Sequence, residues 1–106
     1  MSPGRTRTHA EEVVSALQSQ EERDRFTRSR QVLKNYLIHK REVFNGRDFL
    51  FQGPVVELHE SLRSLRELES HCSRFLEFDY AQIEGYFLLR IVGRPQYLST
   101  IDAYFD

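Results

Sequence analysis

The chain has 106 residues, of which 15 are Lys or Arg and 16 are Asp or Glu, so its formal net charge at pH 7 is −1. This length fits one domain or part of one, and the balanced charge gives no overall field that would select a polyanionic partner. A hydrophobic share of 40% is enough for one core. The single cysteine, Cys72, excludes an intrachain disulfide and a multi-cysteine zinc site.

Residues 1–7 are polar, and we expect a disordered tail there, followed by a single helical domain over 8–106. The tail lacks the apolar segment of a secretory signal, and no apolar run approaches 18 residues. We therefore expect a cytoplasmic protein that is not associated with a membrane. The sequence ends on apolar Tyr104-Phe105 and then Asp106, which is also how a domain cut from a longer chain would end.

The first long helix is predicted over residues 20–44. A short helix precedes it, since Thr8 and Glu11 form a capping box, and Ser19 before acidic residues repeats the pattern. Apolar residues then recur at spacings of 7, 4 and 7, on one side of a helix: Phe26, Leu33, Leu37 and Phe44. Asn45-Gly46 is expected to end this helix, because Gly tolerates the left-handed conformation.

A second long helix is predicted over residues 54–77. Pro54 suits a first helical position, and apolar side chains follow at spacings of 3, 4, 3, 7 and 4. These side chains are Val55, Leu58, Leu62, Leu65, Cys72 and Leu76. Two long helices joined by a short connector pack as an antiparallel pair. The predicted fold is therefore all-α, a helical bundle with shorter helices packed across this pair.

The segment before Gly93 can be interpreted in two ways. Asp79 resembles a helix N-cap and Gly93 a helix stop, which favours a helix over 80–92. The same residues hold a seven-residue apolar run bounded by Gly85 and Gly93, which is typical of a buried strand. We favour the helix, and keep as the alternative an α+β fold with a strand at 85–92. A last helix is predicted over 95–105.

Basic residues line one edge of the predicted helix 20–44. They are Arg23, Arg30, Lys34 and Arg41. If this edge lies beside the acidic second helix, the cations form ion pairs at the rim of the helix contact. Such pairs contribute only about 0–1 kcal/mol each, so they would mainly set the register of packing. The alternative is a stripe that contacts nucleic-acid phosphates, although a nucleic-acid binder of this size usually has a clear basic excess.

Glu69 falls inside the apolar stripe of the predicted helix 54–77. A buried carboxylate needs a cation or hydrogen-bond donors, and we expect Arg30 or Arg90 to supply them. Such a pair would fix the register or a dimer contact more than it would add stability.

Catalytic signals are weak. The segment from Arg66 to His71 resembles the Arg-x4–6-His motif of HEPN ribonucleases, and the resemblance implies an all-helical homodimer that cleaves RNA with these two residues. The four histidines lack metal-ligand spacing, and we expect all of them to face solvent. No glycine-rich phosphate loop is present. We therefore predict no enzyme activity, no cofactor and no metal site.

The helix predicted over 80–92 would be apolar around most of its circumference and would need cover on all sides. The remaining helices can cover about two sides of it. It is therefore either a central core helix or leaves an apolar face that docks a second copy or another protein. Aromatic anchors would be Tyr86, Tyr97 and Tyr104, with orientation set by Glu69, Arg90 and the basic edge. The main functional prediction is thus a non-enzymatic adaptor or homodimer. The alternatives are a nucleic-acid-associated regulator and a HEPN-like ribonuclease.

Overall fold

The computed structural model describes residues 8–72 and 75–106, and its fold is α+β. The predicted tail, residues 1–7, lies outside the described residues. The elements in chain order are α1 (His9–Ala16), α2 (Gln20–Tyr36), β1 (Leu37–Val43), β2 (Gly46–Phe51), α3 (Val55–Cys72), β3 (Leu76–Ile83), β4 (Tyr86–Gly93), the 3₁₀ helix η1 (Pro95–Tyr97) and α4 (Leu98–Asp102).

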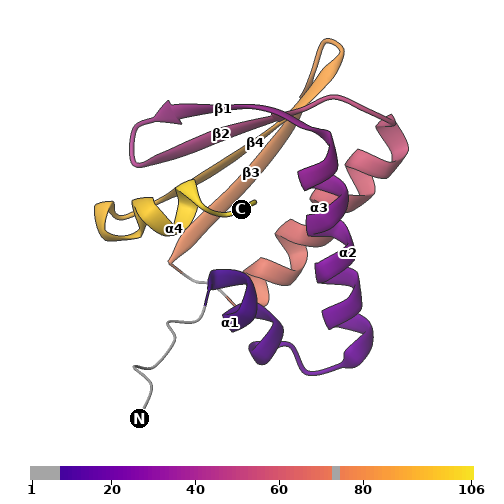
Figure 1. Ribbon diagram of the computed structural model, residues 1–106, viewed down its shortest axis with the longest axis vertical. Coiled ribbons are helices and arrows are strands. Elements are labelled where there is room, and N and C mark those ends of the chain that lie inside the picture. The colour runs from indigo at the N-terminus through magenta and orange to yellow at the C-terminus, as the bar shows by residue number, and fades with distance from the viewer. Residues whose placement is uncertain (1–7, 73–74) are drawn as a thin grey trace.

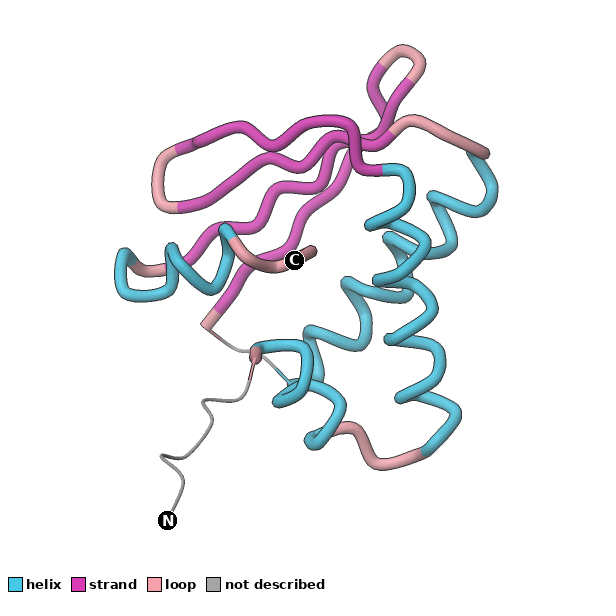
Figure 2. Tube along the Cα trace, viewed as in Figure 1, coloured by secondary structure: helices cyan, strands magenta, loops and turns pink. Residues whose placement is uncertain are grey.

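The four strands form one antiparallel sheet in the order β1-β2-β4-β3. Each edge strand forms a hairpin with its central neighbour, and the two hairpins join where β2 pairs with β4. The helices lie on the same side of this sheet, where α2 and α3 run side by side in opposite directions (Figures 1 and 2).

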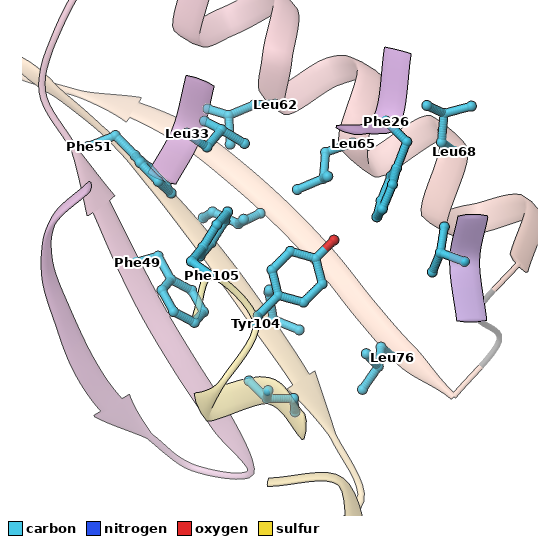
Figure 3. Close-up of a cluster of buried hydrophobic side chains, with 14 of the residues drawn as sticks. Phe26, Leu33, Phe49, Phe51, Leu62, Leu65, Leu68, Leu76, Tyr104 and Phe105 are labelled. Atoms are coloured by element: carbon cyan, nitrogen blue, oxygen red, sulfur yellow. The ribbon is translucent and has the colours of Figure 1, made fainter. Parts of the chain in front are cut away.

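The core lies between the sheet and the helices (Figure 3). Alternate residues of β2 and β4 point into it, and they are Phe49, Phe51, Phe87, Leu89 and Ile91. Helices α2 and α3 cover them with Phe26, Leu33, Leu58, Leu62, Leu65 and Leu68. Tyr104 and Phe105, after α4, fill the space between the two layers. Burying each large apolar side chain stabilises the fold by about 1.5–3 kcal/mol.

The all-α prediction is wrong, and the first error lies in the helix predicted over 20–44. Helix α2 ends at Tyr36, and Leu37 begins β1. The apolar spacing misled because Phe44, its last member, is not a core residue: it is 88% exposed at the tip of the β1–β2 hairpin. Phe44 and Asn45 form the two-residue turn there, Asn45 with a φ of 58°, and Gly46 already belongs to β2, so the chain turns a hairpin instead of ending a helix.

The second predicted helix, 54–77, is also too long. Helix α3 ends at Cys72, and Leu76 already belongs to β3. Leu76 lies in the core all the same, because the inner face of a strand continues the apolar surface that the helix began. The 4-residue spacing from Cys72 to Leu76 therefore runs from a helix into a strand.

The helix predicted over 80–92 is absent, and the chain forms the β3–β4 hairpin there instead. The alternative, an α+β fold with a strand at 85–92, is confirmed, since β4 covers Tyr86–Gly93. Gly85 turns this hairpin with a φ of 76°, a value that glycine adopts without strain. The last predicted helix, 95–105, is reduced to η1 and the short α4.

Local signals at the helix starts are confirmed. The Thr8 hydroxyl accepts a hydrogen bond of 3.2 Å from the Glu11 backbone, and Ser19 accepts one of 3.1 Å from Glu22. Within residues 8–72 and 75–106, no helix has the length and apolar character that crossing a membrane requires.

A substitution at Gly46 tests whether the chain forms a hairpin here or the helix end that the sequence suggested. A Cβ at this position would lie 2.1 Å from the backbone oxygen of Ile91 on β4. We expect Gly46→Ala to lower the free energy of unfolding by about 3 kcal/mol, measured by urea denaturation, because sheet backbone would have to move. At a helix end the same change would cost about 1 kcal/mol or less.

Gly85→Asn is the matched control for this prediction. Gly85 has open space around its Cβ position, and Asn tolerates a left-handed φ. We expect a loss of less than about 1 kcal/mol. Equal losses in the two variants would contradict the packing described for Gly46.

Candidate functional site

The sheet has one face that the helices leave uncovered, and we call it the open face. Strand alternation places there the residues between those that enter the core. They are His39, Arg41 and Val43 of β1, Asp48 and Leu50 of β2, Tyr86, Leu88, Arg90 and Val92 of β4, and Glu77, Asp79, Ala81 and Ile83 of β3. Most of these side chains are half-buried or exposed.

A row of charges crosses all four strands of the open face. The strand register aligns Arg41 with Asp48, Asp48 with Arg90, and Arg90 with Asp79. The Asp48 carboxylate accepts hydrogen bonds from Arg90 Nε at 2.7 Å and Arg90 Nη2 at 2.9 Å, and another from Arg41 Nη2 at 2.8 Å. We call these four residues the charged row, and its signs alternate from β1 to β3.

Asp48 is the fixed centre of the charged row. Its side chain is 0% exposed, while the side chains of Arg41 and Arg90 are 54% and 51% exposed. The hydrogen bond from Arg90 lowers the pKa of Asp48 despite burial, and Arg41 adds to this effect. Asp48 in turn raises the pKa of Arg90. The two guanidinium groups are thus held in place by a carboxylate that water does not reach.

Apolar residues flank the charged row on both sides. On one side the register aligns Leu50, Leu88 and Ala81, with His39 at the β1 end. On the other side Val43 and Val92 lie on either side of Gly46, with Glu77 at the β3 end. This second end adjoins a hollow of about 740 Å³ whose lining includes Phe44, Phe75, Val92 and Tyr97. The open face therefore combines ordered charges with apolar surface.

A buried polar cluster lies on the opposite side of the sheet, among the helices. Glu69 of α3 is fully buried, and its carboxylate contacts His9 Nε2 at 3.0 and 2.9 Å. The Tyr104 hydroxyl donates to Glu69 Oε2 at 2.5 Å. Burial and the Glu69 charge raise the pKa of Tyr104 well above its ordinary value. The cluster joins α1, α3 and the segment after α4.

Glu69 is thus buried, but the predicted arginine partners are wrong. Arg90 binds Asp48 on the other face of the sheet. Arg30 donates from Nε and Nη2 to the backbone oxygen of Tyr104, at 3.0 and 2.7 Å, and from Nη2 to that of Asp106. The expectation that all histidines face solvent is also wrong, because the His9 side chain is almost completely buried.

The predicted basic edge is not one continuous stripe. Arg41 belongs to the sheet, whereas Arg23, Arg30 and Lys34 lie on α2. The Arg23 guanidinium bonds the backbone oxygens of Val14 and Leu17 at the end of α1. With Arg30 held at the C-terminal segment, these two arginines join parts of the fold, and of the three predicted residues on α2 Lys34 is the exposed one.

The predicted aromatic anchors lie in different environments. Tyr104 is buried in the core, while Tyr86 is half-buried on the open face and Tyr97 lines the hollow next to it. Arg66 and His71, the residues of the HEPN-like motif, are exposed on α3, where Arg66 lies over the Tyr80 ring. The four-stranded sheet departs from the all-helical fold that the resemblance implies.

Sequence reasoning missed the central residue, Asp48. It lies in the connector between the two predicted long helices, where Asp48-Phe49-Leu50-Phe51 fits either a short strand or an apolar loop. Two charges followed by three apolar residues show no alternation that would place Asp48 on a strand face. The Asn-Gly pair just before it was the available signal of a hairpin. In residues 8–72 and 75–106, no group of three or more His, Cys, Asp or Glu side chains is placed to hold a metal ion.

Comparisons of the chain with protein-family models, with curated proteins and with solved structures found no match.

The lowered pKa of Asp48 predicts an acid-sensitive contribution to stability. The unfolded chain takes up the proton near pH 4 and the folded chain does so only at lower pH, so stability is present above pH 4 and is lost as pH falls further. We expect Asp48→Asn to lower stability by about 1–2 kcal/mol at pH 7 and to flatten this acid dependence, measured by urea denaturation across pH. Asp79→Asn, at the exposed end of the row, is the control and should change stability by less than about 0.5 kcal/mol.

The raised pKa of Tyr104 predicts the opposite dependence at alkaline pH. Above pH 10 the unfolded chain releases a proton that the folded chain retains, so stability falls as pH rises. We expect Tyr104→Phe to cost about 1.5–3 kcal/mol at pH 7, because Glu69 loses a donor, and to reduce the alkaline fall. Tyr86→Phe on the open face serves as the control, and an equal effect there would contradict the assigned role of the buried cluster.

Proposed function

We propose that the protein is a non-enzymatic interaction module that binds a protein surface through the open face. The observation that carries this proposal is the charged row. Its two arginines are fixed by a buried carboxylate and are flanked by half-buried leucines and valines. Such a pattern supplies apolar area for affinity and ordered charges for orientation.

A protein partner fits the open face better than a nucleic acid. The charged row contains two cations and two anions, and Glu77 adds a further negative charge on the same face. Phosphate binding needs a local excess of cations, and Asp48 instead neutralises the arginines that it holds. The prediction of a nucleic-acid contact along α2 has less support, because Arg23 and Arg30 already bond backbone oxygens.

The buried cluster supports a structural role instead of catalysis. His9 and Tyr104 both direct their polar atoms at Glu69, which is completely enclosed. A general acid or base has to reach a substrate, and this carboxylate reaches other parts of its own fold. We therefore assign the cluster to holding α1 and the C-terminal segment against α3.

The proposal predicts a position-specific contact at Leu88. A photoreactive amino acid at Leu88, in the apolar row beside Arg90, should form an adduct with a protein in cells of the source organism. Adducts are read by mass spectrometry. The yield should fall at least about tenfold when Asp79→Arg is added to the same chain, because the charges orient the partner.

A photoreactive residue at Asp24, exposed on α2 away from the sheet, is the matched control. Equal adducts from both positions, adducts that ignore the change at Asp79, or adducts with RNA would each refute the proposed function.

A further inference from the structure

We infer that the partner of the open face is a second copy of this chain, packed face to face about a two-fold axis that runs parallel to the strands. This inference rests on the proposed function and names its partner. It follows from the order of signs in the charged row, which from β1 to β3 is positive, negative, positive, negative.

A two-fold axis in the interface exchanges the two ends of this row. The axis would pass between β2 and β4, the middle of the sheet. Arg41 of one copy then faces Asp79 of the partner subunit, and Asp48 faces Arg90 of the partner subunit. Each contact occurs twice, as in any isologous interface. Each strand carries one charge of the row, and neighbouring strands are about 4.8 Å apart in both copies. The charges of the two copies therefore have the same spacing and can face each other one to one.

The same axis matches the apolar rows with each other. It leaves the position along the strand unchanged, so Leu50 faces Leu88 of the partner subunit and Val92 faces Gly46 of the partner subunit. Packed sheets are about 10 Å apart, a gap that leucine and valine side chains from both faces fill. Apolar surface therefore meets apolar surface at the central strands, while at the sheet edges His39 faces Ala81 of the partner subunit and Val43 faces Glu77 of the partner subunit.

A two-fold axis along the charged row is disfavoured by charge. An axis that runs across the strands, along the charged row, would place Arg41 on the partner's Arg41 and Asp79 on the partner's Asp79. Like charges facing each other in an interface are strongly unfavourable. The sequence of signs thus favours the axis parallel to the strands over the axis along the row.

The ends of the row are available for contacts between copies. Arg41 donates one amino group to Asp48, while its guanidinium is about half exposed. Asp79 is exposed on the edge strand β3. Asp48 and Arg90, in the middle, already bind each other, and Asp48 is 0% exposed, so the ends of the row carry the contacts between copies.

Two complementary charge reversals test this arrangement on the purified chain, with association measured by analytical ultracentrifugation. Asp79→Arg places Arg opposite Arg41 of the partner subunit, and Arg41→Glu places Glu opposite Asp79 of the partner subunit. We expect each variant alone to have a dimer dissociation constant at least about tenfold above that of the unchanged chain.

A mixture of the two variants should associate again. In the mixed dimer every facing pair is attractive, since the new Arg meets the new Glu and the original Arg41 meets the original Asp79. We expect the mixed dimer to dissociate within about threefold of the unchanged chain. Loss of folding cannot imitate this rescue, and circular dichroism of each variant checks the fold independently. Asp24→Arg, an equal change of charge on α2, is the control that should leave association unchanged.

Three results would overturn the inference: a chain that stays monomeric at millimolar concentration, single reversals that leave association unchanged, or a mixture that is as weak as its components. None of these results by itself refutes the proposed function. If the photoreactive residue at Leu88 forms adducts with another protein only, the open face is a docking surface and the second copy is the wrong partner. If Leu88 forms no specific adduct and the chain is monomeric, both proposals are wrong.

Discussion

The alternation of side chains along β2 and β4 determines both the core on one side of the sheet and the charged row on the other. Phe49, Phe51, Phe87, Leu89 and Ile91 have to leave water, and the helices cover them. A shift of β2 by one residue would turn its phenylalanines outward and bring Asp48 inward, and the same shift of β4 would bring Arg90 inward. The register that builds the core is therefore the same register that aligns the charges on the open face.

The two carboxylates that are fully buried within residues 8–72 and 75–106 show how one small domain accommodates anions in different ways. Asp48 is enclosed by arginines whose outer parts remain in water, so its charge is balanced at the surface. Glu69 lies deep among the helices, where a histidine and a tyrosine contact it. Each acid holds together segments that are far apart in the sequence. Polar groups thus set which parts of the fold meet, and apolar burial supplies the driving force.

Local features were predictable from the sequence, whereas the type of the longer segments was not. The caps at Thr8 and Ser19 depend on a few neighbouring residues, and the structure contains both of them. The apolar spacing that joined Leu33 to Leu37 crosses the boundary between α2 and β1, because a helix and a strand that cover one core can share a periodicity over a few residues. No local rule reveals such a boundary.

The candidate site was harder to predict than the fold. Arg41 and Arg90 were named, but their common partner Asp48 comes from a third strand, and sequence spacing carries no information on which strands are neighbours. The burial of Glu69 followed from its position in an apolar stripe. Its partner His9 did not, because His9 is 60 residues away and stands at the start of a short helix that only the tertiary fold places nearby.

The strand order β1-β2-β4-β3 has a consequence for how quickly the native state is reached. Both hairpins close over two-residue turns, so they need little loop-closure entropy and can assemble on the microsecond scale. The seam where β2 pairs with β4 brings together segments separated by all of α3, so forming it closes a much longer loop than either hairpin does. Docking of two preformed hairpins is then the slow event, and substitutions along that seam should retard refolding more than equal losses of stability in either turn.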